Sequence, residues 1–109
     1  MDLANFDITR FEASVAAAAR LLRALASDRR LLILCQLGDG ERSVGQLRPC
    51  VGLSQSALSQ HLAVLRAESV VATRRDGQTI WYRIADPAAA RVVATLAEIF
   101  CPQDTKAAQ

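Results

Sequence analysis

Residues 53–84 read LSQSALSQHLAVLRAESVVATRRDGQTIWYRI, and within this stretch the hydrophobic period changes from helical to strand-like. In the first half, Leu58, Leu62 and Leu65 share one face of a helix that Ser54 can cap. In the second half, two β-type runs flank Asp76-Gly77, a dipeptide typical of tight hairpins. The stretch therefore predicts an amphipathic helix followed directly by a β-hairpin.

The outer face of this helix carries small, hydrogen-bonding side chains instead of the usual mixture of Glu and Lys. Such a face suits the major groove of DNA, because short side chains allow close approach and their donors and acceptors match base edges. The hairpin that follows is rich in arginine, which is typical of a wing whose tip enters the minor groove. The candidate base-reading residues are Ser54, Gln55, Ser56, Ser59 and Gln60.

Arginines around the helix and hairpin supply candidate phosphate contacts. Residues 42–83 hold six arginines and two acidic residues, so the positive charge of a chain with net charge +2 gathers in the middle. Phosphate contacts set the register of a protein on DNA without reading its sequence. The phosphate candidates are Arg42, Arg48 and Arg66. Arg74, Arg75 and Gln78 lie on the wing and are candidates for contact with the minor groove. His61 is a further candidate, although its place beside the inward leucines also fits packing or hydrogen bonding.

Three helical patterns precede this stretch. Residues 11–25 place an apolar stripe at helical spacing, and residues 27–37 form a second pattern between the N-cap Ser27 and the breaker 38–40. A short helix from residue 43 to about residue 48 is expected to end at Pro49. The stripe of the first helix comprises Phe11, Val15, Ala18, Leu22 and Leu25.

A last helix is predicted over residues 87–101, with Pro87 in its first turn. Four helices, two strands and a final helix make a mainly α fold with a β-hairpin wing, the winged helix-turn-helix. We expect one domain over residues 1–109, with an N-terminal extension over 1–10 and a flexible tail over 102–109. The apolar surface of the last helix comprises Val92, Val93, Leu96, Ile99 and Phe100.

Composition narrows the class of protein. Hydrophobic residues make up 51% of the chain and aromatic residues only 5%, which favours packed helices. No run approaches the roughly 20 apolar residues of a membrane span, and the N-terminus lacks the pattern of a signal peptide. We therefore expect a cytoplasmic protein whose three cysteines are reduced. One histidine, no Gly-rich phosphate loop and no acid pair argue against an enzyme.

The first and last helices also predict a homodimer. Both are rich in Ala, Val and Leu, and a chain of 109 residues has little other core for both to cover. Antiparallel pairing of these helices from two protomers would bury them. It would also present two recognition helices about one DNA turn apart, roughly 34–36 Å, to a palindromic operator.

On these residues the chain resembles the ArsR/SmtB family of bacterial winged-helix repressors. The resemblance covers nearly everything from Leu22 to Phe100, and its most specific parts are LLRALASDRRLLILCQL, LSQSALSQHLAVLRAESVV and TRRDGQTIWYRI. It implies a homodimer that represses a nearby operon and releases DNA when an inducer binds or reacts.

The metal-sensing patterns of the family are absent. Arsenite sensors carry Cys-Val-Cys before the recognition helix, whereas this chain has RPCVGLS, so Cys50 lacks a second thiol two residues on. Zinc sensors use His and acidic residues along the last helix, where this chain offers only Asp86 and Glu98. The extra N-terminal cysteines of cadmium and lead sensors are missing as well. We therefore predict no metal site and no cofactor.

The remaining thiols, Cys35 and Cys101, lie 66 residues apart and are similar in placement to the sensor pair of the family's dithiol branch, whose members respond to sulfide and persulfides. The resemblance implies that reactive sulfur species or oxidants join them through a disulfide or a short sulfur chain, and that DNA is then released. A direct disulfide needs Cα atoms about 4.4–6.8 Å apart, so a wider pair would favour persulfides over peroxide.

Three alternatives stay open. Cys35 alone fits a small apolar residue packed in a core helix. A soft-metal or arsenite-responsive repressor would use thiolates that include Cys50, which we otherwise interpret as a bystander in a loop-like setting. A dimeric interaction module without DNA binding is the third, and the polar helix and basic hairpin speak against it.

Overall fold

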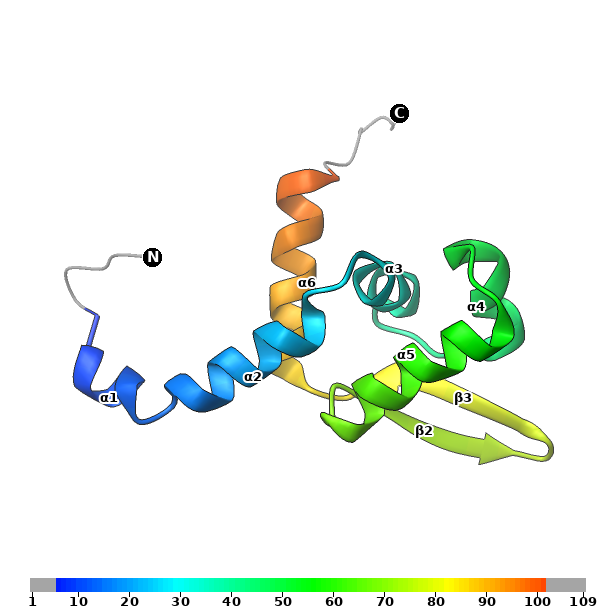
Figure 1. Cartoon of the computed structure of the whole chain (residues 1–109), viewed down its shortest axis with the longest axis horizontal. Coiled ribbons are helices and arrows are strands. Elements are labelled where there is room, and N and C mark those ends of the chain that lie inside the picture. Colours follow the sequence, from blue (N-terminus) through cyan, green and yellow to red (C-terminus); the bar gives the residue numbers. More distant parts are fainter. Residues whose placement is uncertain (1–5, 102–109) are drawn as a thin grey trace.

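The protein is described here by a computed structural model that covers residues 6–101 (Figure 1). Within these residues no helix is long and apolar enough to cross a membrane. The elements follow the order predicted for a winged helix, with a short strand and a short first helix in addition. They are α1 (Ile8–Glu12), α2 (Val15–Leu25), α3 (Asp28–Leu37), β1 (Arg42–Ser43), α4 (Val44–Val51), α5 (Gln55–Ala67), β2 (Val71–Asp76), β3 (Thr79–Ile84) and α6 (Pro87–Phe100).

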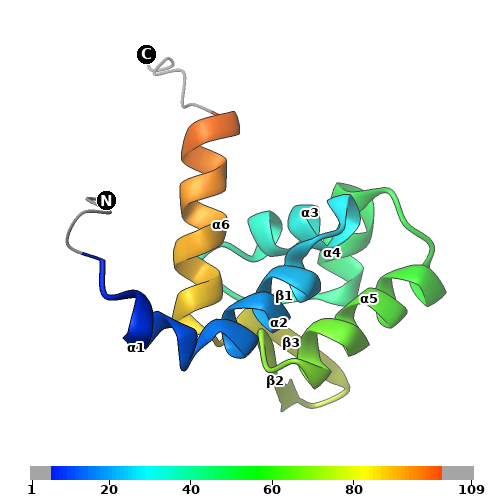
Figure 2. The same ribbon diagram turned by 60° about the vertical axis from the view of Figure 1, so that its left-hand side comes forward.

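The core lies where α3, α4 and α5 meet the base of the wing. The three predicted inward leucines of α5 are at most 1% exposed, so the periodicity of that helix is confirmed. Leu47 and Val51 of α4 are equally buried, and Val93 joins the cluster from α6. Figures 1 and 2 show α3 enclosed between α6 and the α4–α5 pair. Because α3 is central, its side chains can connect the elements on both sides of it.

The hairpin is confirmed as the wing. β2 and β3 pair antiparallel from Val71↔Ile84 to Asp76↔Thr79, so the turn itself consists of Gly77 and Gln78. Gly77 has φ +64°, the conformation that the first central residue of a type II′ turn requires. The sheet has a third strand that the sequence analysis did not predict, because β1 is only two residues long; it pairs with β3 in the order β1-β3-β2.

The predicted helix starts are confirmed by their caps. The Ser27 hydroxyl accepts the Arg30 N–H at 3.2 Å, and the Ser54 hydroxyl accepts the Ala57 N–H at 3.2 Å. Pro87 occupies the first turn of α6. Each of these residues satisfies or removes a donor that the first helical turn leaves unpaired.

The single helix predicted over residues 11–25 is wrong, since the chain breaks between α1 and α2. The Ser14 N–H donates to the Phe11 carbonyl at 2.8 Å, which closes a tight turn, and the Phe11 ring packs on Phe6 at 5.2 Å instead of on the core. Of the predicted stripe only Leu25 is buried, and Leu22 is 58% exposed. Residues 8–10 of the predicted extension belong to α1, whereas the predicted tail 102–109 lies outside the described residues.

The short helix before the recognition helix is longer than predicted. Pro49 was expected to end it, yet α4 continues to Val51 with Pro49 inside. The gain from burying Val51 at 1% exposure favours the extra turn, and Gly52 then ends the helix in the left-handed region at φ +65°. Cys50 consequently lies on a helix and not in the loop-like setting that the sequence suggested.

Candidate nucleic-acid interface and cysteine pair

The outer face of α5 is free to approach a ligand. Gln55, Ser56, Ser59 and Gln60 are all exposed, as the sequence predicted. Ser54 is also exposed, but its hydroxyl already caps the helix, so it offers less to a base than its neighbours. The result is a surface of short amide and hydroxyl groups on a helix whose opposite face is buried, which matches the requirements of major-groove readout.

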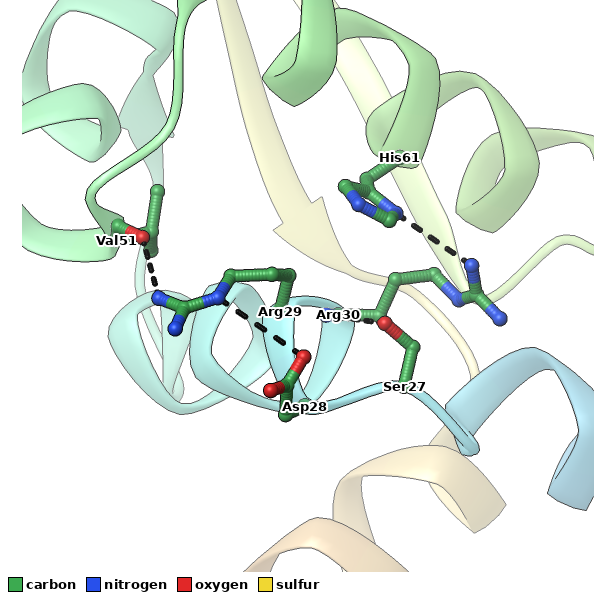
Figure 3. Close-up of polar contacts among 6 residues, drawn as sticks. All are labelled: Ser27, Asp28, Arg29, Arg30, Val51 and His61. Atoms are coloured by element: carbon green, nitrogen blue, oxygen red, sulfur yellow. Dashed lines mark hydrogen bonds and ion pairs between the residues drawn. The ribbon is translucent and has the colours of Figure 1, made fainter.

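His61 is half-buried and lies against Arg30 of α3, with 3.4 Å between Nδ1 and Nη1 (Figure 3). A guanidinium only donates, so Nδ1 of His61 is the acceptor in this contact. The hydrogen-bonding role considered for His61 is therefore present in the structure. This contact fixes the ring beside the recognition surface.

Two consecutive arginines of α3 hold the helix-turn-helix in place, a feature the sequence analysis missed. Figure 3 shows their side chains diverging from the first turn of α3. Arg29 Nη1 donates to the carbonyl of Val51, the last residue of α4, at 2.9 Å. Arg30 Nε donates to the carbonyl of Ala24, in the last turn of α2, at 2.6 Å. Both bonds satisfy carbonyls that a helix C-terminus leaves unpaired.

The signal for this role was in the sequence. Basic residues in the first turn of a helix are disfavoured by the helix dipole, so Arg29 and Arg30 directly after the cap Ser27 need partners elsewhere. A second link between the same regions is the ion pair of Arg20 with Glu68, 2.6 Å from Nε to Oε1, which joins α2 to the end of α5. The pair raises the pKa of Arg20, mainly through the hydrogen bond from its guanidinium to Glu68.

The residues predicted to contact phosphates or the minor groove fall into two groups. Arg66 and Arg75 are exposed and take part in no ion pair within residues 6–101, and Gln78 is exposed at the wing tip. Arg42 and Arg74 are instead engaged within the protein. Arg42 Nε donates to the Gln36 carbonyl at 2.6 Å, so this side chain fastens β1 to α3. Arg48 is exposed on α4.

Arg74 packs into the wing from the face opposite to Arg75, because successive strand residues alternate. Its Nε donates to both carboxylate oxygens of Glu41, at 3.0 and 2.8 Å, and its guanidinium lies 5.7 Å from the centroid of Trp81. The hydrogen bond from Arg74 is the main cause that lowers the pKa of Glu41. The loop after α3 is thereby tied to the wing.

Cys35 and Cys101 lie on α3 and at the end of α6, two helices that contact each other. Both residues are exposed, so the alternative of a thiol packed in the core does not hold for Cys35. The pKa of Cys35 is raised, first by partial burial of its thiol and second by the charge of Cys101. The contact between α3 and α6 thus brings the helices of the two cysteines together although 66 residues separate them in the chain.

Cys50 has a different environment. It is exposed on α4, and its thiol donates to the Gln46 carbonyl at 3.6 Å. Within the described range 6–101, no group of three or more His, Cys, Asp or Glu side chains comes together as a metal site would require.

Comparison with known proteins identifies the family to which this fold belongs. Residues 27–73 match the family model of the bacterial regulatory proteins of the arsR family. The transcriptional activator HlyU of Vibrio cholerae is 43% identical over 98 residues, which cover 90% of this chain and 91% of HlyU. The solved structure of the transcriptional repressor BigR from Xylella fastidiosa has a TM-score of 0.82 at 40% identity, covering 90% of this chain and 100% of that chain.

A third relative informs the assembly. The homodimeric winged helix-turn-helix DNA-binding domain Mb0332 from Mycobacterium bovis has a TM-score of 0.71 at 36% identity and covers 83% of each chain. These proteins are transcriptional regulators and not enzymes, which agrees with the class expected from the sequence. The fold, the polar outer face of α5 and the relatives all indicate a transcriptional regulator. The chain belongs to the ArsR/SmtB family of bacterial transcriptional regulators.

Proposed function

We propose that the protein is a dimeric repressor that releases operator DNA when reactive sulfur species or oxidants bridge Cys35 and Cys101. The observation that carries the proposal is the placement of two exposed cysteines on α3 and at the end of α6, two helices that pack against each other. A thiolate attacks an electrophilic sulfur, and a second thiol within reach then resolves the adduct. Two cysteines on neighbouring helices supply the two thiols that this reaction needs.

The helical register of α6 supports the pairing. Ala90, Ala94 and Ala97 line the side of α6 that faces Cys35, and Cys101 follows Ala97 by four residues, which is the spacing of one helical face. The Cys101 N–H still donates to the Ala97 carbonyl at 2.8 Å, so the helical hydrogen-bond ladder reaches Cys101. The face of α6 that packs along α3 thus leads to the second thiol.

The dimer is proposed through α1, α2 and α6. Exposed apolar side chains gather on these elements: Phe11 is 39%, Leu22 58% and Ile99 60% exposed. Burying such area stabilises by roughly 25 cal/mol per Å² of apolar surface, and exposed apolar patches of this kind mark interfaces. The homodimeric relative from Mycobacterium bovis supports a dimer.

For the DNA we propose a palindromic duplex read by α5 and the wing. Gln55, Ser56, Ser59 and Gln60 would contact base edges, and the unpaired Arg66 and Arg75 would contact phosphates or the minor groove. Arg42 and Arg74 would contact DNA as well, and the bonds of their Nε atoms within the protein hold β1 and the wing in position.

The decisive experiment combines intact mass with DNA binding. Reduced protein is exposed separately to a persulfide, peroxide, diamide, zinc and arsenite, and binding to a duplex selected in vitro by the reduced protein is measured. We expect the persulfide to cause release together with a bridge between Cys35 and Cys101. The response should vanish in Cys35→Ser and in Cys101→Ser but persist in the matched control Cys50→Ser. Release by metal alone, with the thiols unbridged, would overturn the proposal in favour of a thiolate metal sensor.

A further inference from the structure

A cavity of about 430 Å³ lies between α3 and α6 and has Cys35 in its wall. Leu34 lines it from α3, Gly38 and Asp39 from the turn that follows, and Val93 and Ala94 from α6. The volume falls in the range of small-molecule sites, roughly 300–1,000 Å³. Since Ala94 is exposed, the cavity is open to solvent on the α6 side. A reactant can therefore reach Cys35 without unfolding of either helix.

Among residues 6–101, the lining of this cavity is mostly apolar and includes no Lys, Arg or His. Its remaining lining residues are aliphatic, and its two ionisable groups are Cys35 and Asp39. Placing an anion there removes it from water and sets it beside a carboxylate, with no Lys, Arg or His in the wall to compensate. An uncharged molecule incurs neither cost. Partial burial, the main cause of the raised pKa of Cys35, is consistent with this low polarity.

The cavity is compatible with the proposed dimer. It uses the side of α6 that carries Val93 and Ala94, whereas Val92, Leu96 and the exposed Ile99 lie on another side of the same helix. Pairing of two protomers through the second side leaves the first side in contact with α3. The reaction site and the assembly surface are thus separate faces of one helix.

We propose that this cavity selects the inducer by charge and polarity, admitting uncharged sulfane-sulfur compounds such as dialkyl polysulfides and protonated hydropersulfides and rejecting anionic ones. The inference rests on the proposed dithiol function and names the class of reactant for the same site.

With a dialkyl trisulfide the chemistry balances in two steps. The Cys35 thiolate attacks an outer sulfur, a bond forms between Sγ and that sulfur, and the bond to the central sulfur breaks so that R–S–S⁻ leaves with the electron pair. The Cys101 thiolate then attacks Sγ of Cys35, and R–S⁻ leaves. Both thiol protons pass to solvent. The two cysteines are oxidised by two electrons in total, and the trisulfide is reduced to a thiolate and a persulfide anion.

The test compares an uncharged probe with an anionic one, dimethyl trisulfide with tetrathionate, on the full chain. Rates of modification at Cys35 are followed by mass spectrometry after rapid acid quenching, in Cys101→Ser so that the first adduct persists. Cys50, exposed outside the cavity, serves as the internal reference. We expect the ratio of trisulfide to tetrathionate rates at Cys35 to exceed the ratio at Cys50 at least tenfold.

Two variants probe the cavity itself. Ala94→Leu should slow the trisulfide reaction at Cys35 at least fivefold, whereas Ala88→Leu, on α6 but outside the cavity wall, should not. Asp39→Lys should speed the tetrathionate reaction at Cys35 severalfold and leave the trisulfide rate within twofold. Equal ratios at the two cysteines, or no effect of Ala94→Leu, would overturn the selection while leaving the dithiol switch intact. Failure of Cys35 to react with either probe would overturn both.

Discussion

Replacement of Arg30 by alanine offers the sharpest test of how the recognition helix is held. The Arg30 guanidinium reaches three acceptors: the Ala24 carbonyl at 2.6 Å, the Arg23 carbonyl at 3.3 Å and His61 Nδ1 at 3.4 Å. The first two lie in the last turn of α2, and His61 lies on α5. One side chain therefore links the helix that enters the proposed dimer interface to the helix that faces DNA.

The size of the effect follows from these contacts. Each bond of the Arg30 guanidinium has a charged donor, and such a bond contributes about 1.5–3 kcal/mol. Only the bond to Ala24 is short, and the side chain is partly exposed, so the low end of this range applies to that bond and the two longer contacts add little. We expect Arg30→Ala to lower the free energy of unfolding by about 2 kcal/mol, or the melting temperature by about 10 °C. Arg30→Lys should lose most of the same energy, because an ammonium lacks the planar fork.

Operator affinity should fall about tenfold, since a loosened α5 spends less time in the orientation that fits the groove. The assay is fluorescence anisotropy on the selected duplex over a series of salt concentrations, with chemical denaturation at the same protein concentration. The slope of log K against log salt should not change, because Arg30 is bound to the protein and not to phosphate. The control Arg75→Ala should reduce that slope by about one. A comparable loss of slope in Arg30→Ala would refute the reasoning.

Three further predictions follow from single contacts. Cys101→Ser should lower the pKa of Cys35, because the second cause of its elevation is removed, and alkylation by iodoacetamide should then rise at lower pH; an unchanged pH–rate profile would mean that the thiols do not interact. Arg74→Gln should raise the pKa of Glu41 towards its ordinary range, so that the carboxylate protonates at higher pH in an NMR titration; an unmoved titration would argue against the ion pair. Leu47→Ala should cost about 2–5 kcal/mol of unfolding free energy in urea, since Leu47 is 0% exposed, and a loss below about 1 kcal/mol would contradict its place in the core.

The elements with strong local signals were predictable from sequence. The leucine spacing of α5, the Asp76-Gly77 hairpin and the start of α6 at Pro87 each depend on interactions within a few residues, and all three are present. Patterns of neighbouring residues were insufficient where a tertiary contact determines where a helix begins or ends. Val51, buried against the core, carries α4 past Pro49, and the contact of Phe11 with Phe6 accompanies the break before α2.

The candidate site likewise has one part that the sequence predicts and one part that it does not. Exposure of the polar face of α5 follows from periodicity, because the leucines on the opposite face must be buried. The roles of Arg42 and Arg74 did not follow from sequence. Arginine in a basic region is expected to meet phosphate, yet a carbonyl or carboxylate within the fold competes for the same donors. Composition predicts the charge of a surface, and only the fold shows which arginines also make contacts within the protein.

The position of α3 indicates which helix a bridge between the two thiols would move. At its first turn α3 holds α4 and α5 through Arg29 and Arg30, and the turn after its last residue leads to Glu41, which binds the wing. Ile33 and Leu34 anchor it at 0% exposure, whereas the C-terminal half of α6 ends in the exposed Phe100. Tension between Cys35 and Cys101 should therefore displace α6, because moving α3 would disrupt the core. The helix-turn-helix would then stay intact within each protomer while the spacing between the two recognition helices changes. A dimer binds a palindromic site only when that spacing matches the spacing of the two half-sites.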